Sequence, residues 1–156
     1  MSRSIVRLLL CLALCFAIAV LAAVTTKPEI ATWYAELDKP SWTPPDAVFP
    51  VVWTILYVLV ALALWRLWDH APSPARSQAL TFFFVQLALN ALWSPVFFGL
   101  HAVEAALVII VALVIALFGT VLTGARVDRI AALLLVPYLA WVAIATTLNA
   151  GILAMN

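Results

Sequence analysis

The stretch VEAALVIIVALVIALFGTVL, residues 103–122, decides the fold class of this chain. Its only charged side chain is Glu104, and an α-helix of about 20 apolar residues crosses the hydrocarbon core of a bilayer. Four more stretches are similarly apolar, so the sequence predicts membrane-spanning helices at about residues 8–24, 48–68, 78–100, 103–122 and 130–155. The predicted fold is an all-α membrane protein, a five-transmembrane-helix bundle.

Composition supports the same fold class. Hydrophobic residues make up 67% of the 156-residue chain and charged residues 10%, far from the roughly 25% charged residues of soluble domains. Five spans use almost the whole chain, which leaves residues 1–156 as a single transmembrane domain with the lipid bilayer as its solvent. The net charge of +1 and the lack of a basic tract argue against nucleic acid as a partner.

The first apolar run has two interpretations. Its basic start and the small residues near Ala22 are typical of a secretory signal peptide, but 17 unbroken apolar residues exceed the usual apolar core, which favours a retained helix. Cys11 and Cys15 lie one helical turn apart in this run, where helix geometry makes a disulfide between them awkward. We expect both to be small buried residues.

Residues 25–46 form the one long polar segment, and its prolines predict a stiff loop outside the bilayer that caps the bundle. A short interfacial helix is expected at about residues 28–37. Six basic residues lie at the amino terminus and in the second and fourth connections, against two, Lys27 and Lys39, in this loop. The positive-inside rule therefore places the amino terminus in the cytoplasm and loop 25–46 outside.

The third predicted span has two different faces. At 100° per residue, its amides and two of its aromatic residues share one face: Gln86, Asn90, Trp93 and Phe97. An amide in a membrane needs a hydrogen bond or a wet cavity, so this face should point into the bundle. There it either lines a ligand site or bonds neighbouring backbone and holds helices together. The opposite face consists of small residues: Ala88, Ala91, Pro95 and Gly99.

Aromatic side chains in two other spans favour the ligand site. Trp53 and Tyr57 share a face of the second span, and Tyr138 and Trp141 lie in the fifth span. Pro137 should bend that helix and widen the local cavity. Flat π-surfaces with a few amides and phenols suit a flat aromatic ligand.

The remaining polar and aromatic residues have simpler interpretations. Trp65 and Trp68 fit an aromatic belt at the membrane interface. His70 and His101 lie in connections on opposite sides of the membrane, so they cannot form a pair, and we expect both to be solvated. Glu104 has no basic partner within a helical turn other than His101. We expect no ordinary catalytic set and no metal site.

Four blocks of the sequence are familiar as a set. They are KPSWTPP at 39–45, FPVVWTILY at 49–57, QLALNALWSPVFFG at 86–99, and PYLAW at 137–141 with ATTLN at 145–149. They occur in order, span most of the chain, and together resemble the tryptophan-rich sensory protein family, which is also the mitochondrial translocator protein family.

This resemblance implies one pocket beneath the first loop that binds porphyrins, such as protoporphyrin IX and haem, or other flat hydrophobic ligands. The helical wheel places Gln86 at the same site. The family's pocket positions match nine residues here: Tyr34, Pro44, Trp53, Asn90, Trp93, Trp141, Ala145, Leu148 and Asn149. The implied function is a receptor or sensor that regulates tetrapyrrole traffic or a stress response. No cofactor is required, since porphyrin or haem is the ligand.

Two alternative functions stay open. In bacterial relatives, the tryptophans that match Trp53 and Trp141 are associated with light-dependent porphyrin breakdown, so the chain could be a photo-oxidative enzyme that uses these two residues. It could also be a transporter of tetrapyrroles or lipids. Internal repeats and ionisable groups at mid-span, which are typical of transporters, are not apparent in the sequence.

The positive-inside bias and the short carboxyl-terminal tail suggest a bacterial cell membrane, and the small-residue surfaces suggest a homodimer within it. Helix association in lipid depends on close packing, which small residues allow. Besides the strip on the third span, Ala13 and Ala17 form such a strip on the first, and Ala112 and Ala116 on the fourth. The alternative is that the strip on the third span packs against a helix of the same chain.

Overall fold

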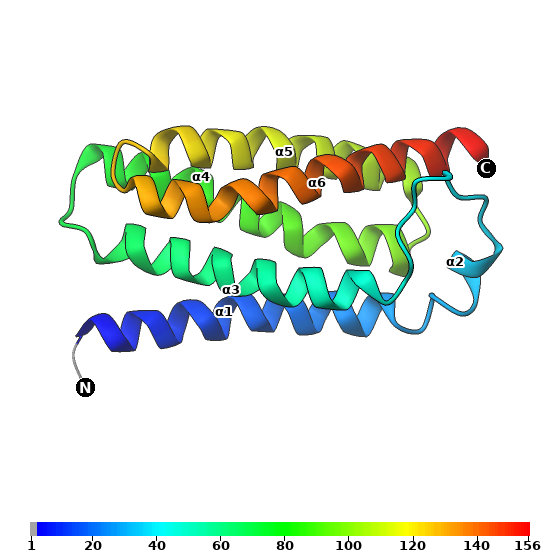
Figure 1. The fold of residues 1–156 in the computed structure, drawn as a ribbon, viewed down its shortest axis with the longest axis horizontal. Helices are drawn as coiled ribbons and strands as arrows, with labels where there is room; N and C mark the ends of the chain where they lie inside the picture. Colours follow the sequence, from blue (N-terminus) through cyan, green and yellow to red (C-terminus); the bar gives the residue numbers. More distant parts are fainter. Residues whose placement is uncertain (1–2) are drawn as a thin grey trace.

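The computed structural model describes residues 3–156, and it is all-helical over that range (Figure 1). Five helices are long and apolar enough to cross a membrane, at 22 to 27 residues each. The elements are α1 (Arg3–Thr26), α2 (Trp33–Glu36), α3 (Val48–Asp69), α4 (Pro74–Ser94), the π-helical turn η1 (Pro95–Gly99), α5 (Val103–Gly124) and α6 (Arg129–Met155). The prediction of an all-α, five-span membrane protein is confirmed. Helix α1 begins earlier than predicted, because Arg3 and Arg7 continue the helix beyond the apolar run.

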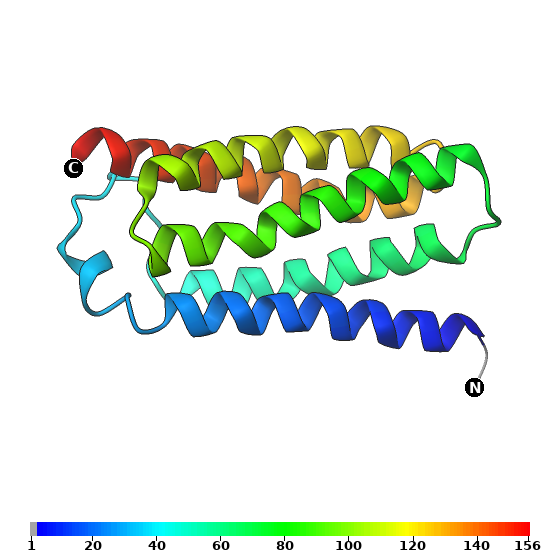
Figure 2. The ribbon, with the colours of Figure 1, turned by 180° about the vertical axis from the view of Figure 1, so that it is seen from behind.

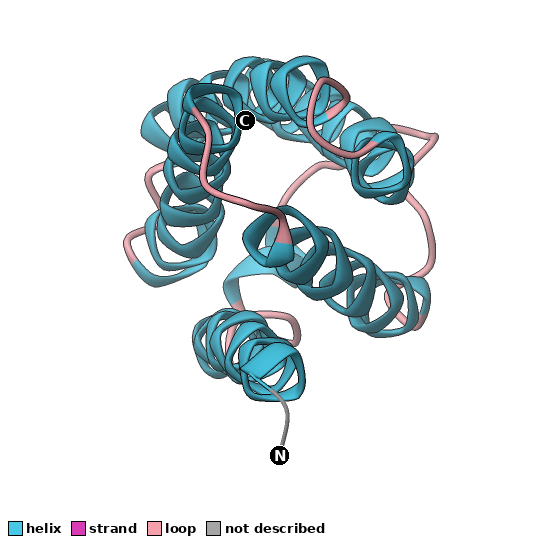
Figure 3. Ribbon diagram, turned by 90° about the vertical axis from the view of Figure 1, so that its left-hand side faces the viewer, coloured by secondary structure: helices cyan, strands magenta, loops and turns pink. Residues whose placement is uncertain are grey.

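The five long helices lie side by side with their axes roughly aligned, so the two ends of the chain lie at opposite ends of the bundle (Figures 1 and 2). The main helix pairs are α1 with α3, α3 with α6, α6 with α5, and α5 with α4. Helix α1 lies at the edge of this arrangement (Figure 3). Its fully buried residues are Cys11 and Cys15, which are free thiols, as predicted.

The outer surface of the bundle is apolar. Large aliphatic side chains on α1, α5 and α6, such as Val20, Val108 and Leu133, are more than half exposed. In water such a surface would be unstable, whereas lipid tails solvate it. The chain is therefore an integral membrane protein.

Helix α4 ends in a way that the sequence did not reveal. Pro95 has no amide hydrogen to continue the α-helical pattern, and the chain widens into η1, where the Leu100 amide donates to the Pro95 carbonyl at 3.0 Å. In this wider turn the adjacent Phe97 and Phe98 are both buried. A single turn therefore supplies two aromatic rings to the bundle interior.

The first loop and α2 cap the end of the bundle that also holds the carboxyl terminus, which we call the loop end (Figure 1). The helix predicted at 28–37 was too long, because residues 27–32 form turns and only Trp33–Glu36 is helical. The connections between α3 and α4 and between α5 and α6 lie at the other end, which we call the opposite end.

Candidate functional site

The centre of the bundle contains a chain of three buried polar side chains, one from each of α3, α4 and α6. The Tyr57 hydroxyl donates to Asn90 Oδ1 at 2.7 Å, and Asn90 Nδ2 donates to the Tyr138 hydroxyl at 2.6 Å. Asn90 therefore points inward, as predicted, and its partners are side chains on facing helices. Such bonds satisfy an amide that lipid could not.

Trp53 forms an aromatic wall beside this chain. Its ring centroid lies 5.5 Å from that of Tyr57 and 6.1 Å from that of Tyr138, in tilted and edge-on arrangements. These distances are within the range of favourable aromatic pairs. One indole thus contacts both phenols of the polar chain.

A second group of predicted residues lies nearer the loop end. Trp93 Nε1 donates to Asn149 Oδ1 at 3.1 Å, and Asn149 Nδ2 donates to the Val103 carbonyl at 3.0 Å. The Trp93 ring stacks on Phe97 with centroids 5.0 Å apart. Leu148, next to Asn149, is buried. This group joins α4, η1, α5 and α6 through aromatic and neutral polar contacts.

The loop contributes Tyr34, which is buried beneath it. The Tyr34 ring lies 5.5 Å from that of Phe98, and the Lys39 ammonium lies 4.7 Å from its centroid, in cation–π contact. Burial, and secondarily the negative charge of Asp46, raise the pKa of the Tyr34 phenol, so it stays neutral. Pro44 is half-buried in the same loop.

The loop is fastened to α6 by its residues 38–42. Asp38 and Asn156 exchange two hydrogen bonds of 3.0 Å, in which the Asp38 amide donates to Asn156 Oδ1 and Asn156 Nδ2 donates to the Asp38 carbonyl. Trp42 Nε1 donates to Thr147 Oγ1 at 3.3 Å. Between these contacts, the Pro40 ring lies so close to Gly151 that a side chain there would collide with it.

A separate fastening holds the start of the loop to the connection between η1 and α5. His101 adopts a left-handed backbone conformation with φ of 55°. Its ring stacks on Trp33 with centroids 4.1 Å apart, and its Nε2 lies 3.0 Å from a Glu29 carboxylate oxygen. His101 is thus paired, which its sequence position did not predict.

Trp141 lies apart from the groups above. It lines an apolar groove of about 300 Å³ between α3 and α6 with Pro137 and Val52, among others. Its ring packs edge-on against Phe49 at 5.6 Å, and its buried Nε1 has no hydrogen-bond partner within residues 3–156. The predicted pocket residues are therefore divided between an aromatic interior and a groove on the α3–α6 side.

The ten predicted ligand-binding residues are distributed as follows. Six extend through the interior from its centre to the loop: Trp53, Asn90, Trp93, Leu148, Asn149 and Tyr34. Gln86 is fully buried one turn from Asn90, Ala145 is half-buried on α6, Trp141 faces the groove, and Pro44 lies in the loop. Their role in ligand binding stays a prediction.

Comparison with known proteins agrees with this architecture. The model of the TspO/MBR family matches residues 11–155, nearly the whole chain. The chain therefore belongs to the TspO/MBR family. Among its relatives, a tryptophan-rich protein TspO of Chlorobaculum tepidum is 44% identical over 100% of this chain and 99% of that protein. The tryptophan-rich sensory protein of Cereibacter sphaeroides is 40% identical over 93% and 88%, and the human translocator protein is 40% identical over 75% and 70%.

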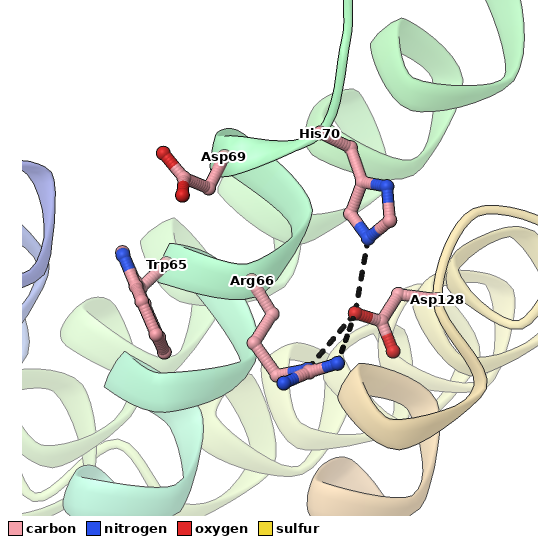
Figure 4. Close-up of a pocket in the computed structure, with 5 residues that line it drawn as sticks. All are labelled: Trp65, Arg66, Asp69, His70 and Asp128. Carbon is pink, nitrogen blue, oxygen red and sulfur yellow. Dashed lines mark hydrogen bonds and ion pairs between the residues drawn. The ribbon is translucent and has the colours of Figure 1, made fainter. Parts of the chain in front are cut away.

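The opposite end of this TspO/MBR bundle holds an ionic cluster that the sequence did not reveal (Figure 4). Asp128 Oδ2 accepts hydrogen bonds of 2.8 Å from both Nε and an Nη atom of Arg66, and His70 Nε2 lies 3.1 Å away. Asp128 Oδ1 accepts from the amides of Ile130 and Ala131 and so caps the start of α6. Burial opposes ionisation, but these hydrogen bonds outweigh it and lower the pKa of Asp128 to about 2.

The same end also ties α1 to α3. Asp69 accepts from Arg7 at 2.8 Å and from the Ser4 hydroxyl at 2.7 Å, and Trp65 Nε1 donates to the Ser4 carbonyl at 3.1 Å. With the Asp128 cluster, Trp65 and Asp69 surround a cavity of about 270 Å³. Within residues 3–156, no three His, Cys, Asp or Glu side chains are grouped so that they could hold a metal ion.

Proposed function

We propose that this protein is a membrane receptor or sensor that binds porphyrins, such as protoporphyrin IX or haem, or other flat hydrophobic ligands, and so regulates tetrapyrrole traffic or a stress response. The observation that carries this proposal is the aromatic interior of Trp53 and Trp93 around the neutral Tyr57–Asn90–Tyr138 chain, beneath a fastened loop. The names of two relatives, a tryptophan-rich sensory protein and a translocator protein, are consistent with it.

The chemistry of this interior suits a flat ligand. Its walls are π-faces, and the described residues at mid-span contain no Asp, Glu, Lys or Arg. The aromatic rings pack directly on one another, so a ligand that enters must take over their contacts, which flat π-surfaces can do with little loss of free energy. The lack of charged groups at mid-span favours a receptor over a transporter.

Titration of the purified protein with protoporphyrin IX in the dark, followed by tryptophan fluorescence quenching, tests the proposal. Asn90→Ala or Trp141→Ala should weaken binding by about tenfold or more, the loss of one good buried contact. Trp68→Ala, at the opposite end, is the control and should bind normally. Equal affinities in all three variants would place the ligand site elsewhere.

A second candidate is light-dependent porphyrin breakdown, which the two tryptophans on facing helices favour. Trp53 packs on both phenols, and Trp141 lines the α3–α6 groove. Under light, an enzyme would bleach successive equivalents of porphyrin, and Trp53→Phe or Trp141→Phe would stop the bleaching while binding in the dark persists. Binding without any bleaching would leave the receptor as the function.

We also propose the setting in which this receptor works. It would lie in a bacterial cell membrane as a homodimer, with its amino terminus in the cytoplasm and the loop outside. Six basic residues on one side against two on the other support the orientation. Ala88 and Gly99, which are exposed on α4 and η1, support a partner on that face.

A further inference from the structure

Gln86 is the one fully buried side chain whose whole polar group has no partner within residues 3–156. It is 0% exposed, and neither Nε2 nor Oε1 makes a hydrogen bond. It lies at the middle of the span Pro74–Gly99, one turn from Asn90. The Asn90 amide, in contrast, makes hydrogen bonds through both Oδ1 and Nδ2. The two amides are thus neighbours on the inner face of α4, one satisfied and one not.

An unpartnered amide at this depth is costly. An amide transferred from water to an apolar environment without a hydrogen bond loses several times the free energy that a typical hydrogen bond contributes. The residues beside it on the same helix, Phe83 and Leu87, are apolar and buried, and a leucine would occupy a similar volume. The amide therefore points to a partner that is not part of the chain.

The polar chain next to it has a hydrogen to spare. Asn90 accepts from one phenol and donates to the other, so the hydroxyl hydrogen of the second phenol, Tyr138, has no acceptor among the described residues. Exchanging the oxygen and nitrogen of the Asn90 amide only transfers this hydrogen to Tyr57. Together, Gln86 and the Tyr57–Asn90–Tyr138 chain offer free donors and, at Gln86 Oε1, a free acceptor.

The charge of the surroundings limits what can bind there. In residues 3–156, every Lys, Arg and His lies in a connection or within two turns of a helix end. An ionised carboxylate at the depth of Gln86 would meet no cation, and its desolvation would not be compensated. A neutral group with a donor beside an acceptor would satisfy the amide at both ends.

We infer that Gln86, with the Tyr57–Asn90–Tyr138 chain, forms the deep polar end of the ligand site and recognises a neutral donor–acceptor group, such as an amide or a lactam. This inference rests on the proposed function and adds the chemical class of the ligand's buried end. The Gln86 Nε2 donates to the ligand's carbonyl, and Oε1 accepts from its N–H, as in paired amides.

Two derivatives of one macrocycle test this recognition. In protoporphyrin IX diamide both carboxyl groups are primary amides, whereas in the dimethyl ester the same two groups are esters, which can only accept hydrogen bonds. The wild-type protein should bind the diamide about tenfold more tightly, the contribution of one added hydrogen bond. Gln86→Leu should remove this preference and raise the melting temperature of the ligand-free protein. Gln78→Leu, at an exposed position near the start of α4, should change neither.

The outcomes separate the inference from the function on which it rests. If the wild-type protein binds both derivatives equally, or if Gln86→Leu retains the preference, the inference is wrong and the porphyrin receptor stands. A lower melting temperature for Gln86→Leu would also overturn it, because the amide would then be satisfied in the ligand-free protein. If neither derivative nor protoporphyrin IX binds, the proposed function itself fails.

Discussion

The two ends of the bundle are held together by different chemistry. At the loop end, aromatic stacking and neutral amides make most of the connections, as in Trp93 with Phe97 and Asp38 with Asn156, beside the partly exposed contact of His101 with Glu29. At the opposite end, the carboxylates of Asp128 and Asp69 bind arginines. Neutral contacts can be exchanged for ligand contacts at little cost, whereas separating Arg66 from the buried Asp128 carboxylate is expensive. We therefore expect ligand binding at the loop end and helix anchoring at the opposite end.

The largest expected effect is an all-or-none difference in accessibility between the two ends. A cysteine at Ala35 in the loop should react with an impermeant thiol reagent in intact cells, whereas a cysteine at Ala71, between α3 and α4, should react only after lysis. Both positions are exposed, and the native Cys11 and Cys15 are buried, so background labelling should be low. The reverse pattern would invert the orientation and leave the fold unchanged.

The next largest effect should come from removing Asp128. Asp128→Ala deletes the cap of α6 and leaves the half-buried Arg66 without its partner, so the free energy of unfolding should fall by about 2–3 kcal/mol. Thermal or denaturant unfolding in detergent measures this. Porphyrin affinity should not change, because Asp128 lies at the opposite end and the proposed ligand contacts lie nearer the loop end. Asp69→Ala, whose ion pair is more exposed, is the matched control and should have a small effect.

Acid should destabilise the opposite end through the same carboxyl group. The folded protein holds the pKa of Asp128 at about 2, below the unfolded value of about 4. Its stabilising contribution is complete above about pH 4 and is lost as the pH falls toward 2, because the unfolded chain then binds a proton that the folded chain does not. Unfolding of the wild-type protein should therefore depend more steeply on pH than that of Asp128→Asn, and parallel curves would contradict the assignment.

Substituting alanine for two glycines with different surroundings should show a smaller effect, on ligand binding at the loop end. A methyl group at Gly151 collides with the Pro40 ring, whereas Gly99 has open space around it. Gly151→Ala should push the loop from α6 and weaken protoporphyrin IX binding by about tenfold, since forced overpacking costs about 1–3 kcal/mol. Hydrogen exchange of residues 38–42 should rise in parallel. Gly99→Ala should bind normally, and unchanged binding in both variants would remove the loop from the ligand site.

The sequence predicted the features that the bilayer imposes. Apolar runs of about 20 residues located the spans, and the spacing of Gln86, Asn90 and Trp93 located the inward face of α4. It could not predict which partners these side chains meet, because Asn90 bonds residues 33 and 48 positions away. The Asp38–Asn156 fastening joins residues 118 positions apart. Asp128 directly before a helix was a capping signal, but its ionic partners required the tertiary structure.

The small-residue strip on α4 and η1 runs from the middle of the bundle to the loop end, and it is the surface on which we expect the dimer. Ala88 and Gly99 are exposed, and Ala91 and Pro95 are half-buried, so this chain covers the strip only in part. Ala13 and Ala17 on α1 are exposed as well, whereas Ala116 on α5 is buried, which leaves the α5 strip largely inside the protomer.

The smallest expected effect is therefore a shift in the dimer population that leaves both ends of the bundle unchanged. Ala88→Leu adds bulk on the exposed strip and should reduce crosslinked dimer in native membrane several-fold, because close approach of the helices is lost. Ala105→Leu, at an exposed position near the start of α5, is the control. Porphyrin binding should persist in both variants, since Asn90 and Trp93 face the other way. If Ala91→Leu instead abolishes porphyrin binding while crosslinking persists, the strip packs inside the protomer and the two faces of α4 were assigned wrongly.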